Sequence, residues 1–241
     1  MERLYNYCFE KRNVRILDVG CGEGEFIEDL FKIFEDYDYI YAIDVDKDVV
    51  NRINDKYSSR NVKALEANIE NLPFESEYFD IVSISRTLHH LPNAGLSLSE
   101  AKRVMKKDGY LIINEMIYDN QSLRQEVFME IHHFKGDVDM ILGNYHHNTL
   151  SKEEIKNSID ENGLTIEFSF EFLEDTGIPC TPERIEEKKN EILINLNRVK
   201  GHSKYNEFKV RGNKIIDKLY ERGIWGPRHL VAVCKKVISQ S

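Results

Sequence analysis

The chain lacks the features that mark membrane, secreted and zinc-ribbon proteins. It contains no apolar run near the roughly eighteen residues of a membrane-spanning helix, and residues 1–13 are polar and charged, unlike a signal peptide. Its four cysteines, Cys8, Cys21, Cys180 and Cys234, form no C-x-x-C pair and no disulfide framework. No internal repeat or low-complexity tract is present. We therefore expect a cytoplasmic protein with reduced thiols and no membrane partner.

The chain also lacks the positive charge of most nucleic-acid-binding proteins. It carries 33 Lys and Arg against 42 Asp and Glu, a formal net charge of −9, whereas phosphate contacts require a basic surface. Residues 175–228 are an exception, with 12 basic and 8 acidic residues, which leaves −13 on the remainder. This segment is interpreted either as a basic surface that holds an anionic substrate or as a solvated helix face.

The order of the elements predicts an α/β fold. The 241 residues are 41% hydrophobic, enough for one large domain that spans 1–241. Alternating strands and helices are typical of a doubly wound parallel sheet with helices on both faces. The strands are expected near 14–19, 39–44, 61–66, 79–85, 109–116, 164–173 and 229–236. The helices are expected near 24–36, 46–57, 95–107 and 151–162, the last with a capping box from Ser151 to Glu154.

The run from Ile16 to Glu25 combines an apolar strand with three alternating glycines, at 20, 22 and 24. Glycines at a strand–helix turn let the backbone approach a ligand closely. A dinucleotide fingerprint has its third glycine one residue later, where this chain has Glu25, which argues against a nicotinamide-dependent oxidoreductase. Asp18, just before the loop, suits a ligand with an amino group or a positive charge.

A second acidic residue, Asp44, ends the next apolar strand, 20 residues after Gly24. A carboxylate there can accept hydrogen bonds from both ribose hydroxyls of an adenosine. With this residue, the chain resembles the class I (Rossmann-like) S-adenosylmethionine-dependent methyltransferases. Five motifs carry the resemblance in the family's order over roughly 14–115: ILDVGCGEG, YAIDVD, ANIENLPF, FDIVSISRTLHHLP and DGYLIINE.

The resemblance implies S-adenosylmethionine as cofactor, S-adenosylhomocysteine as product, and a seven-stranded sheet whose last strand is antiparallel. Asp18 and the glycine loop would hold the methionine portion, Asp44 the ribose, and Val45 would flank the adenine. Asn68 stands where the family often has Asp but retains an acceptor oxygen. Arg86 would pair with the methionine carboxylate or form a surface salt bridge. The cofactor-binding residues implied are Asp18, Gly20, Cys21, Gly22, Gly24, Asp44, Val45, Asn68, Ile69, Ser85 and Arg86.

Two segments, 117–150 and 175–228, are inserts in the minimal fold. Both leave the carboxyl ends of strands, where ligands bind in open α/β sheets, so we expect helical lids over the pocket. Structural padding or a dimer surface is the alternative. The first should contain a helix with Leu123, Val127 and Ile131 buried. The second should contain two helices, the first capped by Thr181 and Pro182.

Six of the eight histidines form adjacent pairs: His89 and His90, His132 and His133, and His146 and His147. His90 and His146 are the candidate catalytic bases, because a base with a near-neutral pKa assists methylation of a hydroxyl or thiol. A turn with only a structural role is the alternative for the first pair. No metal site is expected, because adjacent helical residues point about 100° apart and cannot chelate as a pair. A loop could still gather Asp137 and Asp139 with His146.

The predicted function is methyl transfer by in-line displacement to a small-molecule acceptor. The L-H-H-L-P run at 88–92 resembles that of methyltransferases of the ubiquinone/menaquinone-biosynthesis type. A tRNA or other anionic acceptor, or a non-catalytic S-adenosylmethionine-binding protein, are the alternatives. The amphipathic helices expected in 182–222 could also form a homodimer.

Overall fold

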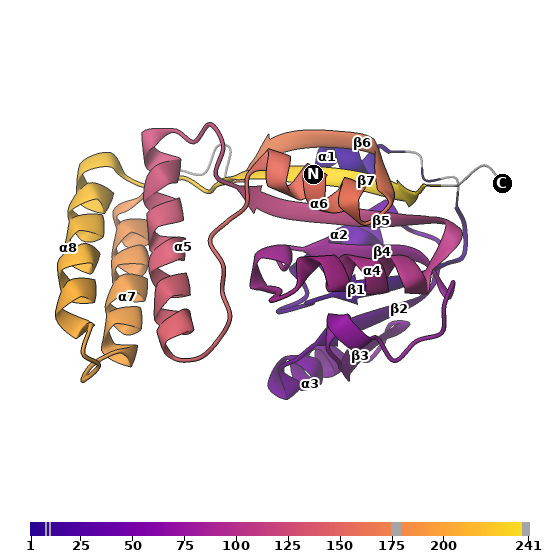
Figure 1. Cartoon of the computed structure of the whole chain (residues 1–241), viewed down its shortest axis with the longest axis horizontal. Coiled ribbons are helices and arrows are strands. Elements are labelled where there is room, and N and C mark those ends of the chain that lie inside the picture. The colour runs from indigo at the N-terminus through magenta and orange to yellow at the C-terminus, as the bar shows by residue number, and fades with distance from the viewer. Residues whose placement is uncertain (8, 10, 175–179, 238–241) are drawn as a thin grey trace.

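The computed structural model describes residues 1–7, 9, 11–174 and 180–237. Its centre is a seven-stranded sheet in the order β3-β2-β1-β4-β5-β7-β6 (Figure 1). The strands are β1 (Val14–Val19), β2 (Tyr37–Asp44), β3 (Val62–Glu66), β4 (Phe79–Ser85), β5 (Met105–Ile117), β6 (Leu164–Leu173) and β7 (Arg228–Lys236). β7 runs antiparallel to β5 and β6, and the pairs from β3 to β5 are parallel. The predicted fold class is therefore confirmed.

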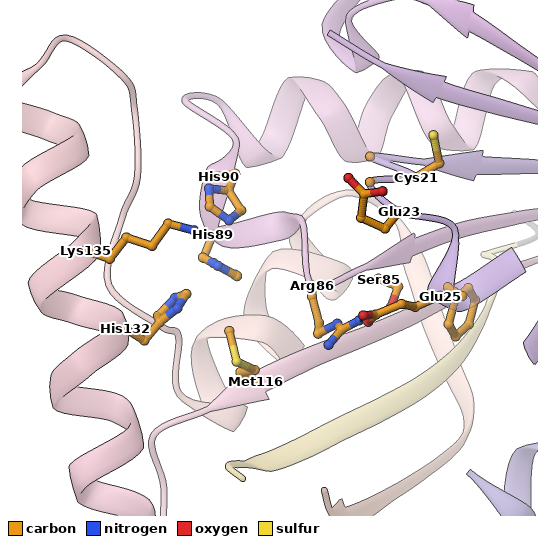
Figure 2. A pocket seen from close by; sticks show the side chains of 13 residues that line it. Cys21, Glu23, Glu25, Ser85, Arg86, His89, His90, Met116, His132 and Lys135 are labelled. Atoms are coloured by element: carbon orange, nitrogen blue, oxygen red, sulfur yellow. The ribbon is translucent and has the colours of Figure 1, made fainter. Parts of the chain in front are cut away.

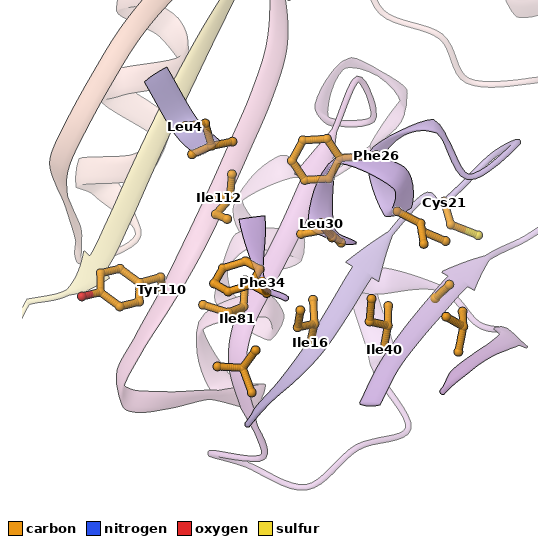
Figure 3. Packing of buried hydrophobic residues seen from close by; sticks show 14 of the residues in the cluster. Leu4, Ile16, Cys21, Phe26, Leu30, Phe34, Ile40, Ile81, Tyr110 and Ile112 are labelled. Atoms are coloured by element: carbon orange, nitrogen blue, oxygen red, sulfur yellow. The ribbon is translucent and has the colours of Figure 1, made fainter. Parts of the chain in front are cut away.

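Helices cover both faces of the sheet. Neighbouring strand residues point to opposite faces, so Ile16 belongs to one buried cluster and Leu17 to the other. The Ile16 cluster includes residues of α1 (Glu2–Tyr5), α2 (Glu25–Ile33) and α3 (Lys47–Lys56). Figure 3 shows Leu4 of α1 and Phe26 and Leu30 of α2 in this cluster. The Leu17 cluster includes residues of α4 (Ala94–Val104) and α6 (Lys152–Glu161). The strands are thus buried on both sides, as their apolar sequences indicate.

Local capping signals were reliable, but two predicted helix ends were wrong. The helix expected over 24–36 ends at Ile33, and a second helix also ends early. Ser151 and Glu154 form the predicted capping box of α6, and the Thr181 side chain accepts a hydrogen bond from the Arg184 N–H at the start of α7 (Pro182–Arg198). The helix predicted over 95–107 ends at Val104, and β5 begins at Met105. Val104 and Met105 are fully buried, and Met105 already pairs with β4. Tertiary pairing therefore overrides the helical pattern there.

The two inserts build one three-helix unit. Helix α5 (Leu123–Ile141) packs with α7 and α8 (Tyr205–Arg222) around a separate core that contains Val127, Phe134 and Phe208. Figure 1 shows these helices side by side at the end of the sheet where β5 and β6 terminate. Leu123, predicted to be buried, is 60% exposed, because it begins the helix one turn before Val127, where the shared core starts. Residues 175–179 of the second insert lie outside the described residues.

Two further sequence predictions concern membrane-spanning helices and the cysteines. Over the described ranges, no helix combines the length and the apolar character needed to cross a membrane. Cys21, Cys180 and Cys234 are free cysteines, as predicted, and Cys8 lies outside the described residues.

Candidate functional site

The glycine loop after β1 presents an open side to solvent. Gly20, Gly22 and Gly24 all have positive φ, at 67°, 47° and 80°, a conformation that glycine adopts without steric cost. A Cβ on Gly20 would lie 2.4 Å from the Thr87 Oγ1, so protein packing requires this glycine. A Cβ on Gly22 would meet nothing within 4 Å. The open side of Gly22 is therefore free for a ligand.

A cavity of about 630 Å³ lies along this loop at the carboxyl ends of the strands. Its lining includes part of the predicted cofactor site: Gly20, Gly22, Asp44, Val45, Asn68, Ile69 and Arg86. The structure thus brings these residues, which come from four strand ends, around one space of a size typical for small-molecule sites.

The Asp44 carboxylate organises the loop as well as the cavity wall. Its Oδ2 accepts a hydrogen bond from the Gly22 N–H at 3.1 Å, and its Oδ1 accepts one from the Asp46 N–H at 3.0 Å. Val45 follows with 69% of its surface exposed, an apolar surface that a bound ring could cover. Across the cavity, the Asn68 Oδ1 caps the short helix η1 (Ile69–Asn71) by accepting from the Glu70 N–H at 2.9 Å.

Asp18 lies behind the loop and is not among the residues that line this cavity. It is 1% exposed, and its Oδ1 accepts a hydrogen bond from the Ser83 Oγ at 2.6 Å, whereas its Oδ2 has no partner among the described residues. Burial, assisted by the nearby Asp44 charge and opposed by the Ser83 hydrogen bond, raises the pKa of Asp18 to about 7. Direct contact between Asp18 and the methionine portion stays a prediction, and Gly24 likewise lies outside the lining.

A second cavity, of about 350 Å³, lies between the glycine loop and α5. Cys21 and Ser85 line it, together with Gly20, Gly22, Arg86 and His90, which also line the first cavity. Figure 2 shows His132 and Lys135 reaching into it from α5, opposite His89 and His90. The two cavities are therefore neighbours, and a helix of the first insert covers the second one.

Arg86 stands between these cavities with a positive φ of 50°. Its guanidinium forms ion pairs with Glu25 of α2 and, at 3.5 Å, with Glu174 just after β6. Of the two roles that the sequence suggested, the structure shows the salt bridge. Pairing with a methionine carboxylate stays a prediction.

Four histidines from three pairs far apart in the sequence gather beside the second cavity, and three of them, His89, His90 and His132, line it. The ring centroids of His90 and His146 lie 4.2 Å apart, and those of His132 and His146 lie 4.9 Å apart. His89 and His90 come from the short helix η2 (Leu88–His90), His132 from α5, and His146 from the loop after α5. His133 instead contacts the Thr149 Oγ1 at 2.9 Å, and His147 is exposed.

The two predicted bases differ in position and in basicity. His90 lines both cavities, but burial, with the neighbouring His89 and His146, lowers its pKa to about 3. This makes it a weak proton acceptor at neutral pH. Burial also lowers the pKa of His146, against a hydrogen bond to Asp139 that raises it, and His146 lines neither cavity. Their catalytic roles stay predictions.

Comparison with known proteins shows which family part of the chain resembles. Residues 17–113 match the family described as "Methyltransferase domain". The segment from β1 to β5 therefore resembles a methyltransferase domain. This match and the sheet order confirm the predicted resemblance to class I methyltransferases. Helices α5, α7 and α8 lie outside the matched residues.

Relatives with a curated function match less than half of the chain. The chain is 35% identical over 109 residues to the ubiquinone/menaquinone biosynthesis C-methyltransferase UbiE of Campylobacter jejuni. It is 32% identical over 105 residues to the protein of the same name from Vibrio parahaemolyticus. These matches cover 44% and 42% of this chain, and 46% and 40% of the relatives. The chain thus matches less than half of either relative.

Solved structures share the fold over nearly the whole chain. The YcgJ protein from Bacillus subtilis has a TM-score of 0.63 at 16% identity and covers 95% of each chain. An S-adenosylmethionine-dependent methyltransferase from Methanosarcina mazei has a TM-score of 0.60 at 14% identity and covers 99% of each. The [4+2]-cyclase SpnF scores 0.62 at 16% identity, covering 98% of this chain and 80% of its own. At these identities the likeness concerns the fold alone.

Sequence reasoning missed two carboxylates that contact residues lining the cavities. Glu115 near the end of β5 is fully buried and lies 2.8 Å from the His89 Nδ1. Glu174 contacts Arg86 and lies 3.5 Å from the His229 Nε2. An acidic residue inside the apolar run of β5 was a visible signal for Glu115. Of the three residues in the suggested loop cluster, Asp139 and His146 meet at 3.0 Å, whereas Asp137 pairs with Arg211.

Proposed function

We propose that this protein transfers a methyl group from S-adenosylmethionine to a small-molecule acceptor. The observation that carries the proposal is the pair of neighbouring cavities, one along the glycine loop and one between that loop and α5. The first has the residues for a cofactor and the second has room for an acceptor. The match to a methyltransferase domain and to C-methyltransferases supports the proposal.

The residues of the larger cavity fit the cofactor. The open side of Gly22 leaves room where a Cβ would stand, Asp44 has a carboxylate at the tip of β2, and exposed Val45 offers an apolar surface for a purine. Bound S-adenosylmethionine supplies an electrophilic methyl group on its sulfonium. The chain's own residues would orient the cofactor and exclude water from the reacting pair.

The acceptor site favours a small molecule over a macromolecule. The second cavity holds about 350 Å³, and α5 stands over it with His132 and Lys135 directed inward (Figure 2). A site of this size suits a metabolite. A tRNA acceptor would need a wider approach and a basic surface. We infer that α5, α7 and α8 act together as the lid, because they share one core.

Substitution of Asp44 tests the cofactor site. Asp44→Asn keeps an acceptor for the Gly22 N–H but removes the charge that would bind the ribose hydroxyls. Because hydrogen bonds to charged groups contribute about 1.5–3 kcal/mol, we expect affinity for S-adenosylmethionine to fall about 10- to 100-fold by calorimetry. The matched control is Asp46→Asn, since Asp46 is an exposed N-cap that accepts from the Asp48 N–H and Asn caps equally well.

Turnover is measured with cofactor labelled in the methyl group and a pool of small metabolites. Transfer of label to a metabolite that Asp44→Asn slows, but Asp46→Asn does not, supports the proposal. Tight cofactor binding with no transfer to any metabolite would favour the non-catalytic alternative. Transfer of label to tRNA alone would replace the small-molecule acceptor.

A further inference from the structure

Three histidines converge where the body of the fold meets the helical unit. His89, His132 and His146 each place one ring nitrogen so that these atoms lie within 4.8 Å of one another. His89 follows β4, His132 lies in α5, and His146 lies in the loop after α5. The cluster is thus assembled from segments on both sides of the second cavity, and Figure 2 shows His89 and His132 from its two walls.

The tautomer of His89 follows from its carboxylate partner. Glu115 accepts hydrogen bonds from the backbone N–H groups of Leu88 and Met116, and its Oε1 lies 2.8 Å from the His89 Nδ1. His89 therefore donates through Nδ1 and keeps its lone pair on Nε2. That Nε2 is buried, and no hydrogen-bond partner for it exists in the described part of the chain. A buried hydrogen-bond acceptor without a partner destabilises the folded protein, so the His89 Nε2 is a candidate to bind a ligand.

His146 repeats this arrangement. Its Nδ1 lies 3.0 Å from the Asp139 Oδ2, and the other oxygen of Asp139 forms an ion pair with Arg198 at 2.7 Å. The His146 lone pair is therefore also on Nε2, which lies 3.3 Å from the His132 Nε2. Nitrogen ligands about 2.0–2.1 Å from a tetrahedral zinc ion are separated by about 3.3 Å. The spacing of these two atoms is that of a ligand pair.

We propose that His89, His132 and His146 bind one divalent transition-metal ion of the zinc type. Glu115 and Asp139 then act as the outer carboxylates that orient two of the ligands, the arrangement common to histidine metal sites. Three imidazoles leave one tetrahedral position open, and His89 and His132 both line the 350 Å³ cavity. The open position thus faces the space that we assign to the acceptor.

Charge and connectivity agree with this site. Lys135 also lines the cavity, and its positive charge repels a cation. The carboxylates of Glu115 and Asp139 face two of the ligands and offset this repulsion.

A direct N–H···N hydrogen bond between His132 and His146 would also explain their 3.3 Å spacing. It would leave the His89 Nε2 without a partner. A metal ion would contact all three nitrogens once the side chains close in, because these atoms lie within 4.8 Å of one another and ligands of one zinc ion are at most about 4.2 Å apart. The ion would also join α5 and its loop to the segment after β4.

Metal content of tag-free full-length protein tests the proposal without any methyl transfer. The protein is stripped with a chelator, dialysed against zinc or cobalt ions, and measured by atomic emission. We expect one ion per chain, and cobalt should show the visible absorption of a tetrahedral site. Wild-type protein that retains no stoichiometric ion would overturn the proposal, whatever its activity with S-adenosylmethionine.

Two variants and one control locate the ion. His132→Gln, on a half-buried helix position, should weaken metal affinity by more than about 100-fold, and Asp139→Asn, which leaves all three ligands, by about 10- to 100-fold. His147→Gln alters the exposed neighbour of His146 and should leave affinity unchanged. Circular dichroism checks that each variant is folded. Equal metal loss from the His147 and His132 variants, or full retention by both His132→Gln and Asp139→Asn, would contradict the assignment.

Discussion

Replacing Asp18 by Asn should remove a pH-dependent cost from the stability of the fold. Asp18 is buried behind the glycine loop, and chiefly this burial raises its pKa from 3.8 to about 7. Between these two values the folded protein keeps a proton that the unfolded chain has lost. The free energy of unfolding therefore falls as pH rises from about 4 to 7 and levels off above 7. Asn keeps an oxygen for the Ser83 hydroxyl but does not ionise.

The magnitude follows from the two pKa values. Each pKa unit corresponds to about 1.4 kcal/mol, so the full cost above pH 7 is about 4 kcal/mol. Between pH 5 and pH 8 the cost to the wild type grows by about 2–3 kcal/mol. The Asn amide introduces its own cost, because no described group bonds the Asp18 Oδ2, but that cost does not change with pH. The change in the stability difference between the two proteins is therefore the measured quantity.

Urea unfolding at pH 5 and pH 8, followed by circular dichroism, measures this change. We expect Asp18→Asn to gain about 2–3 kcal/mol relative to the wild type between the two pH values. Asp46→Asn, at an exposed carboxylate, is the control for a general charge effect and should show no such gain. If the Asp18 variant and the wild type respond to pH alike, Asp18 is already ionised in the folded protein and the reasoning fails.

Two further predictions concern packing. Gly20→Ala places a Cβ 2.4 Å from the Thr87 Oγ1 and should destabilise the protein by about 2 kcal/mol or more, because steric overlap adds to the positive φ. Gly22→Ala meets no such obstacle and should destabilise the protein by about 1–2 kcal/mol, yet it should weaken binding of S-adenosylmethionine more than Gly20→Ala does. Urea unfolding measures the stability of each variant, and calorimetry measures its affinity for the cofactor. Equal loss of stability at both sites would refute the argument. In the helical unit, Phe134→Ala removes a fully buried ring and should cost about 3–5 kcal/mol. Leu193→Ala, at a position 41% exposed on α7, should change the free energy of unfolding by no more than about 0.5 kcal/mol. A similar loss of stability in the Phe134 and Leu193 variants would show that the three-helix core is not packed as described.

Local sequence determined most of the methyltransferase fold. The apolar strands, the glycine loop and the side-chain caps at Ser151 and Thr181 depend on neighbouring residues, so their patterns are visible without the structure. The position of Asp44 could also be predicted from the sequence, because a residue at the tip of a strand has a known position relative to the sheet edge.

The tertiary structure decided which histidines lie together and which carboxylates contact them. His89, His132 and His146 come from segments that no periodicity connects, and only the placement of α5 and the loop after it beside the segment that follows β4 brings them together. The fold also buries Glu115 against His89, and pairing with β4 turns the predicted end of the helix at Met105 into strand. Long-range contacts of this kind depend on the whole arrangement of the core. The sequence therefore indicated where the cavity along the glycine loop would form, and the tertiary structure alone determined which side chains lie beside it.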